Sequence, residues 1–170
     1  TIARSFDGHL EVLHGVANWH ASLDATDRTS FLSFVDRALL RHPGIQALSW
    51  NRRVELKDRA AFEAAQTAWW PGFRMTEHDA QGRIVKALPR AESFFVTWIA
   101  PLQGNESAVG YDVGSHPARL PSLHQARDTV FPAGCDDVPC AFRVDLEVLL
   151  ARTPVRDLAG GVENDALSGC

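Results

Sequence analysis

The hydrophobic residues change their spacing at Gly72, and this change restricts the fold more than any other feature of the chain. Before Gly72, apolar residues recur at intervals of three and four, as in residues 31–39. After Gly72, apolar and polar residues alternate, most clearly in residues 73–88. The first spacing is typical of helices and the second of strands. The chain is therefore predicted to be α+β. A long N-terminal helix would be followed by a mostly antiparallel sheet with helices on its flanks.

The first helix is predicted to be long. Ile2, Phe6, Leu10, Leu13 and Ala17 form one apolar stripe along residues 1–23. At 1.5 Å per residue such a helix would be about 33 Å long, more than a compact lobe of this size needs. Two interpretations stay open: a stalk or dimer helix, and a helix packed along its own domain.

Three further helices are expected before residue 130. The second follows the capping residues Thr26 and Asp27 and ends at the HPG of residues 42–44. The third covers LKDRAAFEAAQTAWW, residues 56–70, and ends before Pro71. The fourth is predicted to start at Ser115 as its cap, with a proline in its first turn. The apolar face of the third helix is predicted to comprise Ala61, Ala65, Ala68 and Trp69.

Most of the strands are expected after Gly72, and one strand is expected before it. GIQALSW, residues 44–50, is predicted to be a buried strand. Residues 73–88 are predicted to form an antiparallel pair around the glycine-containing turn DAQGR. SFFVTWIAP, residues 93–101, and AVGYDV, residues 108–113, complete the predicted sheet. Residues 130–139 are expected to be a loop, and residues 141–152 to begin as a strand and end as a helix.

Charge and hydropathy exclude several classes of partner. The net charge is −4 with a pI near 5.9, and no run of Lys or Arg forms a stripe for nucleic acid. The longest apolar runs, such as residues 94–101, are much shorter than the roughly 20 residues that cross a bilayer. The chain begins inside a helical pattern without Met, so we expect it to be a soluble part of a membrane-anchored protein.

The cysteine and histidine spacings do not predict a metal site or a cofactor. Cys135 and Cys140 lie in CDDVPC, with no histidine nearby, whereas structural zinc usually has four ligands at short paired spacings. They are predicted either as free thiols or as a small loop disulfide. None of the seven histidines forms the H-x-x-x-H pair that binds zinc on one helical face.

Asp112 and His116 are the nearest approach to a catalytic acid and base. The chain contains neither a G-x-S-x-G nucleophile motif nor a glycine-rich phosphate loop. We therefore expect no catalytic residues, and we predict Asp112 either as a carboxylate that faces a ligand or as a structural cap. Trp98 and Tyr111, on neighbouring predicted strands, could form aromatic walls for a planar ligand or belong to the core.

Four blocks of sequence together resemble a CHASE domain. They are GIQALSWNRRV, DRAAFEAAQ, GFRMTEHDAQG and RAESFFVTWIAPLQGNESAVGYDVGSHPARLPSLHQARDTV. The resemblance spans about residues 6–130 and resumes at FRVDLEVLLART. This family forms the extracytoplasmic sensory region of membrane-bound histidine kinases and nucleotide cyclases, including the plant cytokinin receptors. Phe95 departs from the family, which usually has proline there, and the segment before FRVDLEVLL is shorter than usual.

The resemblance implies a domain layout. A long helix would cover residues 1–25, and a membrane-distal PAS-like sensor lobe would cover residues 26–130. Residues 131–158 would be the remnant of a shortened membrane-proximal lobe, and residues 159–170 a flexible tail.

The resemblance also implies a ligand site for an adenine-like or other small polar molecule. The candidate ligand-binding residues are Glu92, Thr97, Trp98, Tyr111 and Asp112. Arg119 and Arg127 resemble recurring arginines of the family and are predicted to be structural, forming salt bridges with Asp112 or Asp128.

The predicted function is that of a non-catalytic sensor. The chain would be the periplasmic or extracellular portion of an inner-membrane or plasma-membrane receptor, would bind a small molecule and would dimerise through its first helix. Two alternatives stay open: a small soluble hydrolase that uses Asp112 and His116, and a dimerisation module without a ligand.

Overall fold

The computed structural model describes residues 11–16, 18–19, 27–43, 45–129 and 145–148. Residues 11–16 are helical, within the first predicted helix. The rest of that helix lies largely outside the described residues, as do Cys135, Cys140 and the predicted tail. Within the described part, no helix is long and apolar enough to span a membrane.

The central sheet is mixed. Strand β1, Ala47–Glu55, pairs antiparallel with β4, Glu92–Ala100, and parallel with β5, Asp145–Val148. Strands β2, Thr76–His78, and β3, Ile84–Lys86, form the predicted hairpin. Residues 110–112 join the two sheets, because Tyr111 bridges to Thr76 and Asp112 bridges to Phe95. The resulting order is β3-β2-(110–112)-β4-β1-β5.

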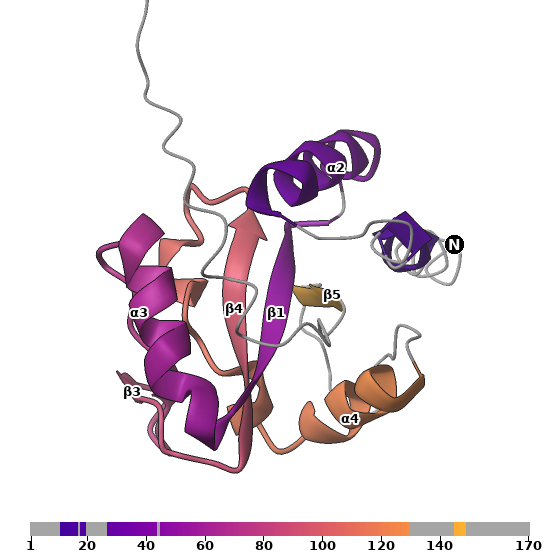
Figure 1. The fold of residues 1–170 in the computed structure, drawn as a ribbon. Helices are drawn as coiled ribbons and strands as arrows, with labels where there is room; N and C mark the ends of the chain where they lie inside the picture. Colours follow the sequence, from indigo (N-terminus) through magenta and orange to yellow (C-terminus); the bar gives the residue numbers. More distant parts are fainter. Residues whose placement is uncertain (1–10, 17, 20–26, 44, 130–144, 149–170) are drawn as a thin grey trace, which may run out of the picture.

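Three helices with full descriptions surround this sheet (Figure 1). Helix α2, Arg28–Arg41, starts at the predicted cap Asp27, whose Oδ1 accepts a hydrogen bond of 2.9 Å from the Ser30 N–H. Helix α3, Arg59–Trp69, follows a 3₁₀ turn at Leu56–Asp58. Helix α4 covers Leu120–Thr129, and further 3₁₀ turns lie at Glu106–Ala108 and Val113–Ser115.

Three predictions of secondary structure are wrong. The predicted strand at residues 108–113 contains only isolated bridges at Tyr111 and Asp112, and Ala108 and Val113 belong to 3₁₀ turns. Strand β1 continues through NRRVE to Glu55, because β4 offers a pairing partner along its whole length. Helix α4 starts five residues after Ser115. Ser115 ends the preceding 3₁₀ turn instead, and its hydroxyl donates to the carbonyl oxygen of Asp112 at 2.6 Å.

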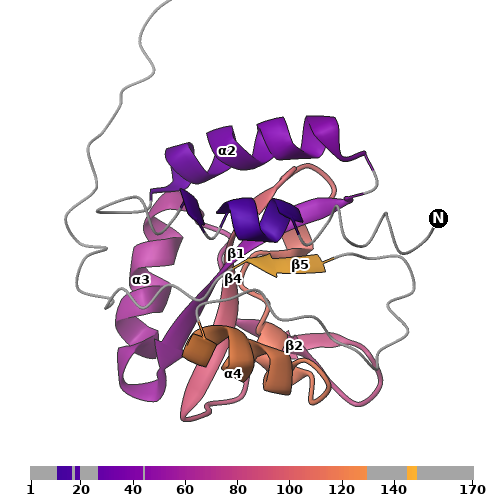
Figure 2. The same cartoon turned by 90° about the vertical axis from the view of Figure 1, so that its right-hand side faces the viewer.

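The core contains two hydrophobic clusters. In the first, Trp50 and Trp98 stack with ring centroids 6.0 Å apart, and Phe31 of α2 contacts both rings. In the second, Phe95 stacks on Phe62 of α3 at 5.7 Å. Its neighbour Phe94 projects to the opposite face of the sheet, as alternation requires, and contacts His124 of α4. Helices α3 and α4 accordingly lie on opposite sides of β4 and β1 (Figures 1 and 2).

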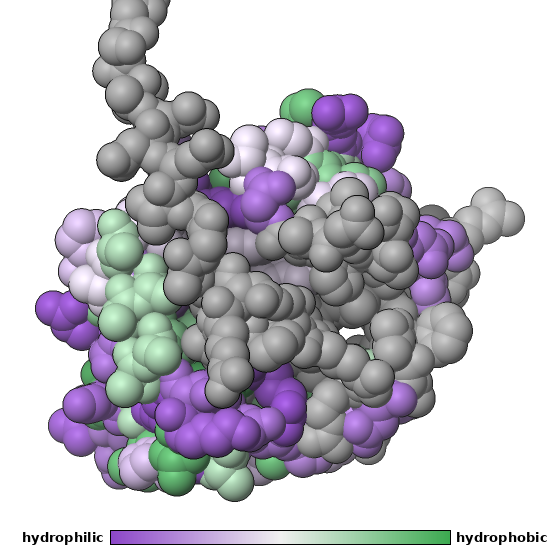
Figure 3. Space-filling model, viewed as in Figure 1, coloured by the Kyte–Doolittle hydropathy of each residue, from purple (hydrophilic) through white to green (hydrophobic). Residues whose placement is uncertain are grey.

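The predicted apolar face of α3 is wrong. The helix buries Phe62 and Gln66, whereas Ala61 and Ala68 are exposed. A phenylalanine ring removes far more apolar surface from water than an alanine methyl group, so it determines which face is buried. The outer face of α3 consequently forms a weakly hydrophobic surface (Figure 3).

Candidate functional site

Asp112 lies at the centre of a buried polar cluster. Its side chain is fully inaccessible to solvent. Oδ1 accepts hydrogen bonds of 3.0 Å from the backbone N–H groups of Phe94 in β4 and Gly114 in the following 3₁₀ turn. Asp112 is therefore the cap of that turn and also attaches residues 110–112 to β4, which supports the second of its two predicted roles.

Arg90 connects Asp112 to a second buried carboxylate, Glu77 of β2. The Arg90 Nη1 atom lies 2.5 Å from Glu77 Oε2 and 3.5 Å from Asp112 Oδ2. Glu77 Oε2 also accepts a hydrogen bond of 3.1 Å from the Leu88 N–H. One guanidinium group, one third exposed, thus serves two carboxylates that are almost fully buried. We call Glu77, Arg90 and Asp112 the carboxylate cluster.

The two carboxyl groups of the carboxylate cluster shift their pKa values in opposite directions. The hydrogen bond from Arg90 lowers the pKa of Glu77, although burial opposes it. Burial raises the pKa of Asp112, although the Phe94 N–H and the charge of Arg90 oppose it. Ionised Glu77 thus stabilises the fold above its ordinary pKa of 4.5, and this contribution is lost as the pH falls through the lowered value. Asp112 has the opposite dependence, because its folded form takes up a proton more readily than the unfolded chain.

We expect Glu77→Gln to flatten the acid side of the stability profile. The variant should be less stable than wild type at neutral pH, and the difference should shrink as the pH falls below 4.5, because only the wild type loses the ionised Glu77. Urea unfolding at a series of pH values measures this. Parallel profiles for the two proteins would contradict the assignment.

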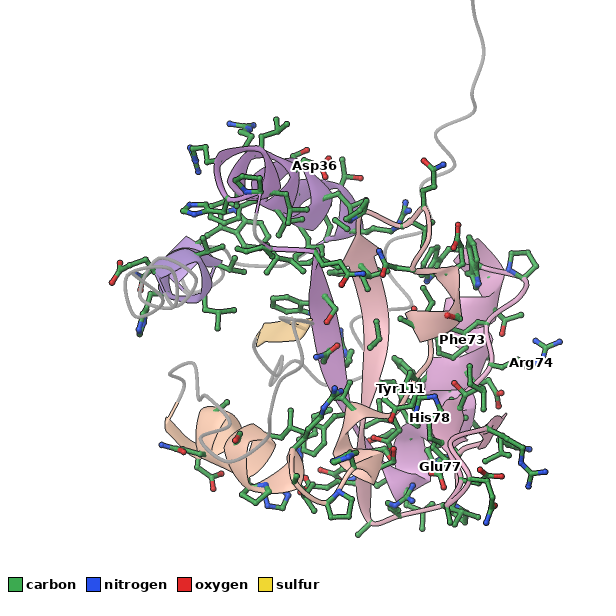
Figure 4. All side chains as sticks on the ribbon, turned by 180° about the vertical axis from the view of Figure 1, so that it is seen from behind. Asp36, Phe73, Arg74, Glu77, His78 and Tyr111 are labelled. Atoms are coloured by element: carbon green, nitrogen blue, oxygen red, sulfur yellow. The ribbon has the colours of Figure 1, made fainter. Side chains whose placement is uncertain are left out.

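The two predicted aromatic walls do not come together. Trp98 is buried in the cluster with Trp50 and Phe31. Tyr111 packs against the other cluster, and its ring lies 5.0 Å from that of His78. Figure 4 shows Tyr111 and His78 side by side. This arrangement therefore does not favour a planar ligand held between Trp98 and Tyr111.

Glu92 lies in a second polar group, on the α4 side of the sheet. Its Oε2 accepts a hydrogen bond of 2.6 Å from Arg53 Nε, and its Oε1 lies 3.0 Å from His124 Nε2 of α4. Arg53 also contacts Glu55 at 3.3 Å. This group connects β1, β4 and α4 through the side chains of Arg53, Glu92 and His124.

The remaining predicted residues are Thr97, Arg119, Arg127 and Asp128. Thr97 is buried, and its hydroxyl donates to the Phe95 carbonyl oxygen at 3.2 Å. Arg119 lies just before α4, where its N–H donates to His116 O at 3.0 Å. Asp128 is on the exposed side of α4, and the side chain of Arg127 lies outside the described residues.

The geometry does not favour a catalytic dyad of Asp112 and His116. Asp112 is sealed from solvent, and the contacts described for its carboxylate are to Phe94, Gly114 and Arg90. His116 is exposed, and its Nδ1 faces the Ala118 N–H at 3.3 Å. A substrate that reached His116 would not reach the carboxylate.

Three buried polar residues of β1, Ser49, Asn51 and Arg52, are not among the predicted site residues. Ser49 is 7% exposed and Asn51 1% exposed. Ser49 lay near the end of the predicted buried strand at residues 44–50, which gave a signal, whereas Asn51 lay just beyond the predicted strand. These residues lie opposite the point where β4 contains an extra residue, Thr97, between the pairs that Trp50 and Asn51 form.

The fold and its interior define an α+β domain built on one mixed sheet with an ion-paired cluster inside it. A family model described as the CHASE domain matches residues 24–139, and the chain belongs to this family. This match confirms the resemblance found in the sequence. CHASE domains are extracytoplasmic sensory domains of signalling receptors. The comparison with curated proteins gives no match.

Proposed function

We propose that this chain is a non-catalytic domain that senses a small molecule for a membrane-bound histidine kinase or cyclase. The observation that carries the proposal is the family match, since residues 24–139 include α2, α3, α4 and the strands β1 to β4. The sealed state of Asp112 supports the non-catalytic part, because the strongest acid–base candidate of the sequence is engaged in holding the fold.

The proposed mechanism is a shift, caused by the ligand, in the equilibrium between two conformations of the domain. A ligand shifts an equilibrium only by its difference in affinity for the two states. Helix α4 is held to the sheet by His124, through Glu92 and Phe94, so a ligand that alters this contact would change how α4 sits. In the proposal, an adenine-like or other small polar ligand acts on the periplasmic or extracellular side, and the receptor dimerises through its first helix.

Saturation-transfer NMR on the purified domain tests binding and turnover in the same sample. Purines, nucleosides, amino acids and small carboxylates are the compounds to use. We expect saturable transfer to at least one compound, no new resonances from conversion, and the same result for His116→Ala. Conversion that His116→Ala abolishes would establish the hydrolase instead, and the absence of transfer to every compound would contradict the sensor.

A further inference from the structure

The side-chain amide of Asn51 is buried with unused hydrogen-bonding capacity. Ser49 Oγ donates to Asn51 Oδ1 at 3.1 Å, so the carbonyl end of the amide is occupied. The amide nitrogen is buried and has no hydrogen-bond acceptor among the described residues. A buried donor left without a partner costs stability, whereas an apolar side chain of the same size would not.

Asn51 points toward the α4 side of the sheet. Ser49, Asn51 and Arg53 alternate along β1 and therefore share one face. The hydrogen bond between Ser49 and Asn51 agrees with this. Arg53 bonds Glu92, and Glu92 bonds His124 of α4, which identifies the face. We call Ser49, Asn51 and Arg53 the polar row.

The opposite strand is irregular at the same place. Trp50 pairs with Trp98, but Asn51 pairs with Val96, so Thr97 is an additional residue in β4. Such bulges disrupt the ladder locally and often redirect side chains next to binding sites. The unpartnered amide and the bulge thus coincide in the middle of the sheet, and they are independent observations.

We propose that the Asn51 amide donates a hydrogen bond to an acceptor atom of a small uncharged ligand bound on the α4 face of the sheet. This inference rests on the proposed sensing function and specifies its ligand. Ser49 acts as a positioning residue, because it holds Oδ1 and leaves the two N–H groups for the ligand.

The charge of the ligand follows from the groups along the polar row. Arg53 is already paired with Glu92 and Glu55, so it offers no unpaired charge to an ionic ligand. Burying an ion without a counter-charge is far more costly than burying a hydrogen-bonded neutral group. A carbonyl oxygen or an unprotonated ring nitrogen on a neutral molecule fits a neutral amide donor.

The test uses matched neutral and anionic probes on the ¹⁵N-labelled domain. The pairs are nicotinamide with nicotinate, and uracil with orotate, each at up to about 10 mM, which suits weak fragment-sized ligands. We expect a neutral probe to shift the Asn51 side-chain amide resonances and to raise the melting temperature. We expect its anionic partner to bind at least about tenfold more weakly.

Two variants separate a ligand contact from a structural role. Ser49→Ala combined with Asn51→Leu removes both polar partners, which leaves stability unchanged or higher, and should weaken probe binding at least about tenfold. Thr76→Val is the matched control, because it removes another buried hydroxyl that has no partner among the described residues, and it should retain binding.

The outcomes distinguish this inference from the proposed function. Equal binding to the double variant, or a bound probe that leaves the Asn51 amide resonances unmoved in wild type, would overturn the role of Asn51 while sensing stands. The wild-type resonances decide this even if the double variant does not fold. If only charged compounds bind, in this experiment and in the saturation-transfer experiment, the ligand class is wrong. If no compound binds at all, both proposals fail.

Discussion

Gly110→Ala should destabilise the domain by at least about 3 kcal/mol, enough to remove most of the stability of a marginally stable domain. Gly110 has φ +86°, which alanine rarely adopts. A Cβ atom there would lie 2.0 Å from the carbonyl oxygen of Arg74. Neither backbone can easily move, because Gly110 N donates to Val96 O at 2.8 Å and Gly110 O accepts from Thr76 N at 2.9 Å.

Gly104→Ala is the matched control for this change. Gly104 has a similar φ of +83°, but nothing lies within 4 Å of an added Cβ atom. The backbone cost alone should then be about 1 kcal/mol. Urea unfolding followed by circular dichroism compares the two variants. Equal losses would mean that residues 110–112 do not hold β2 against β4 as described.

Arg90→Ala should lower the free energy of unfolding by about 2–3 kcal/mol. The change leaves Glu77 and Asp112 without their shared cation, and removing one partner of a buried pair leaves an uncompensated buried charge. The effect stays at the lower end of the usual range because the Arg90 side chain is 33% exposed, so water can reach the site.

Arg83→Ala tests whether burial produces that cost. Arg83 pairs with Asp79 at 2.8 Å, but its side chain is 74% exposed, so the change should cost about 0.5 kcal/mol or less. If both arginine variants lose the same stability in urea unfolding at neutral pH, the carboxylate cluster does not contribute as proposed.

Features with local causes could be predicted from the sequence. Asp27 caps α2 because a short carboxylate reaches an N–H group three residues later. The hairpin of β2 and β3 follows from the alternation around its turn. The family likeness was also visible, because it depends on the order of several blocks.

Features that depend on residues distant in the sequence could not be predicted in this way. Asp112 was recognised as a polar position, but Arg90 and Glu77 become its neighbours only when β2 lies beside residues 110–112. The extra residue Thr97 gives no signal of its own, since threonine is an ordinary strand residue. The buried face of α3 was missed because its alanines suggested a stripe that Phe62 overrides by size.

A thermal-shift screen of the purified domain tests the central claim, that this CHASE domain binds a small molecule, most directly. Purines, nucleosides, amino acids and small carboxylates should be included, with Thr76→Val and the Ser49→Ala, Asn51→Leu double variant beside the wild type. A ligand at 100 times its Kd should add about 2.7 kcal/mol to the stability of the wild type and of Thr76→Val. A screen in which no compound raises the melting temperature of the wild type in a saturable manner would contradict the account.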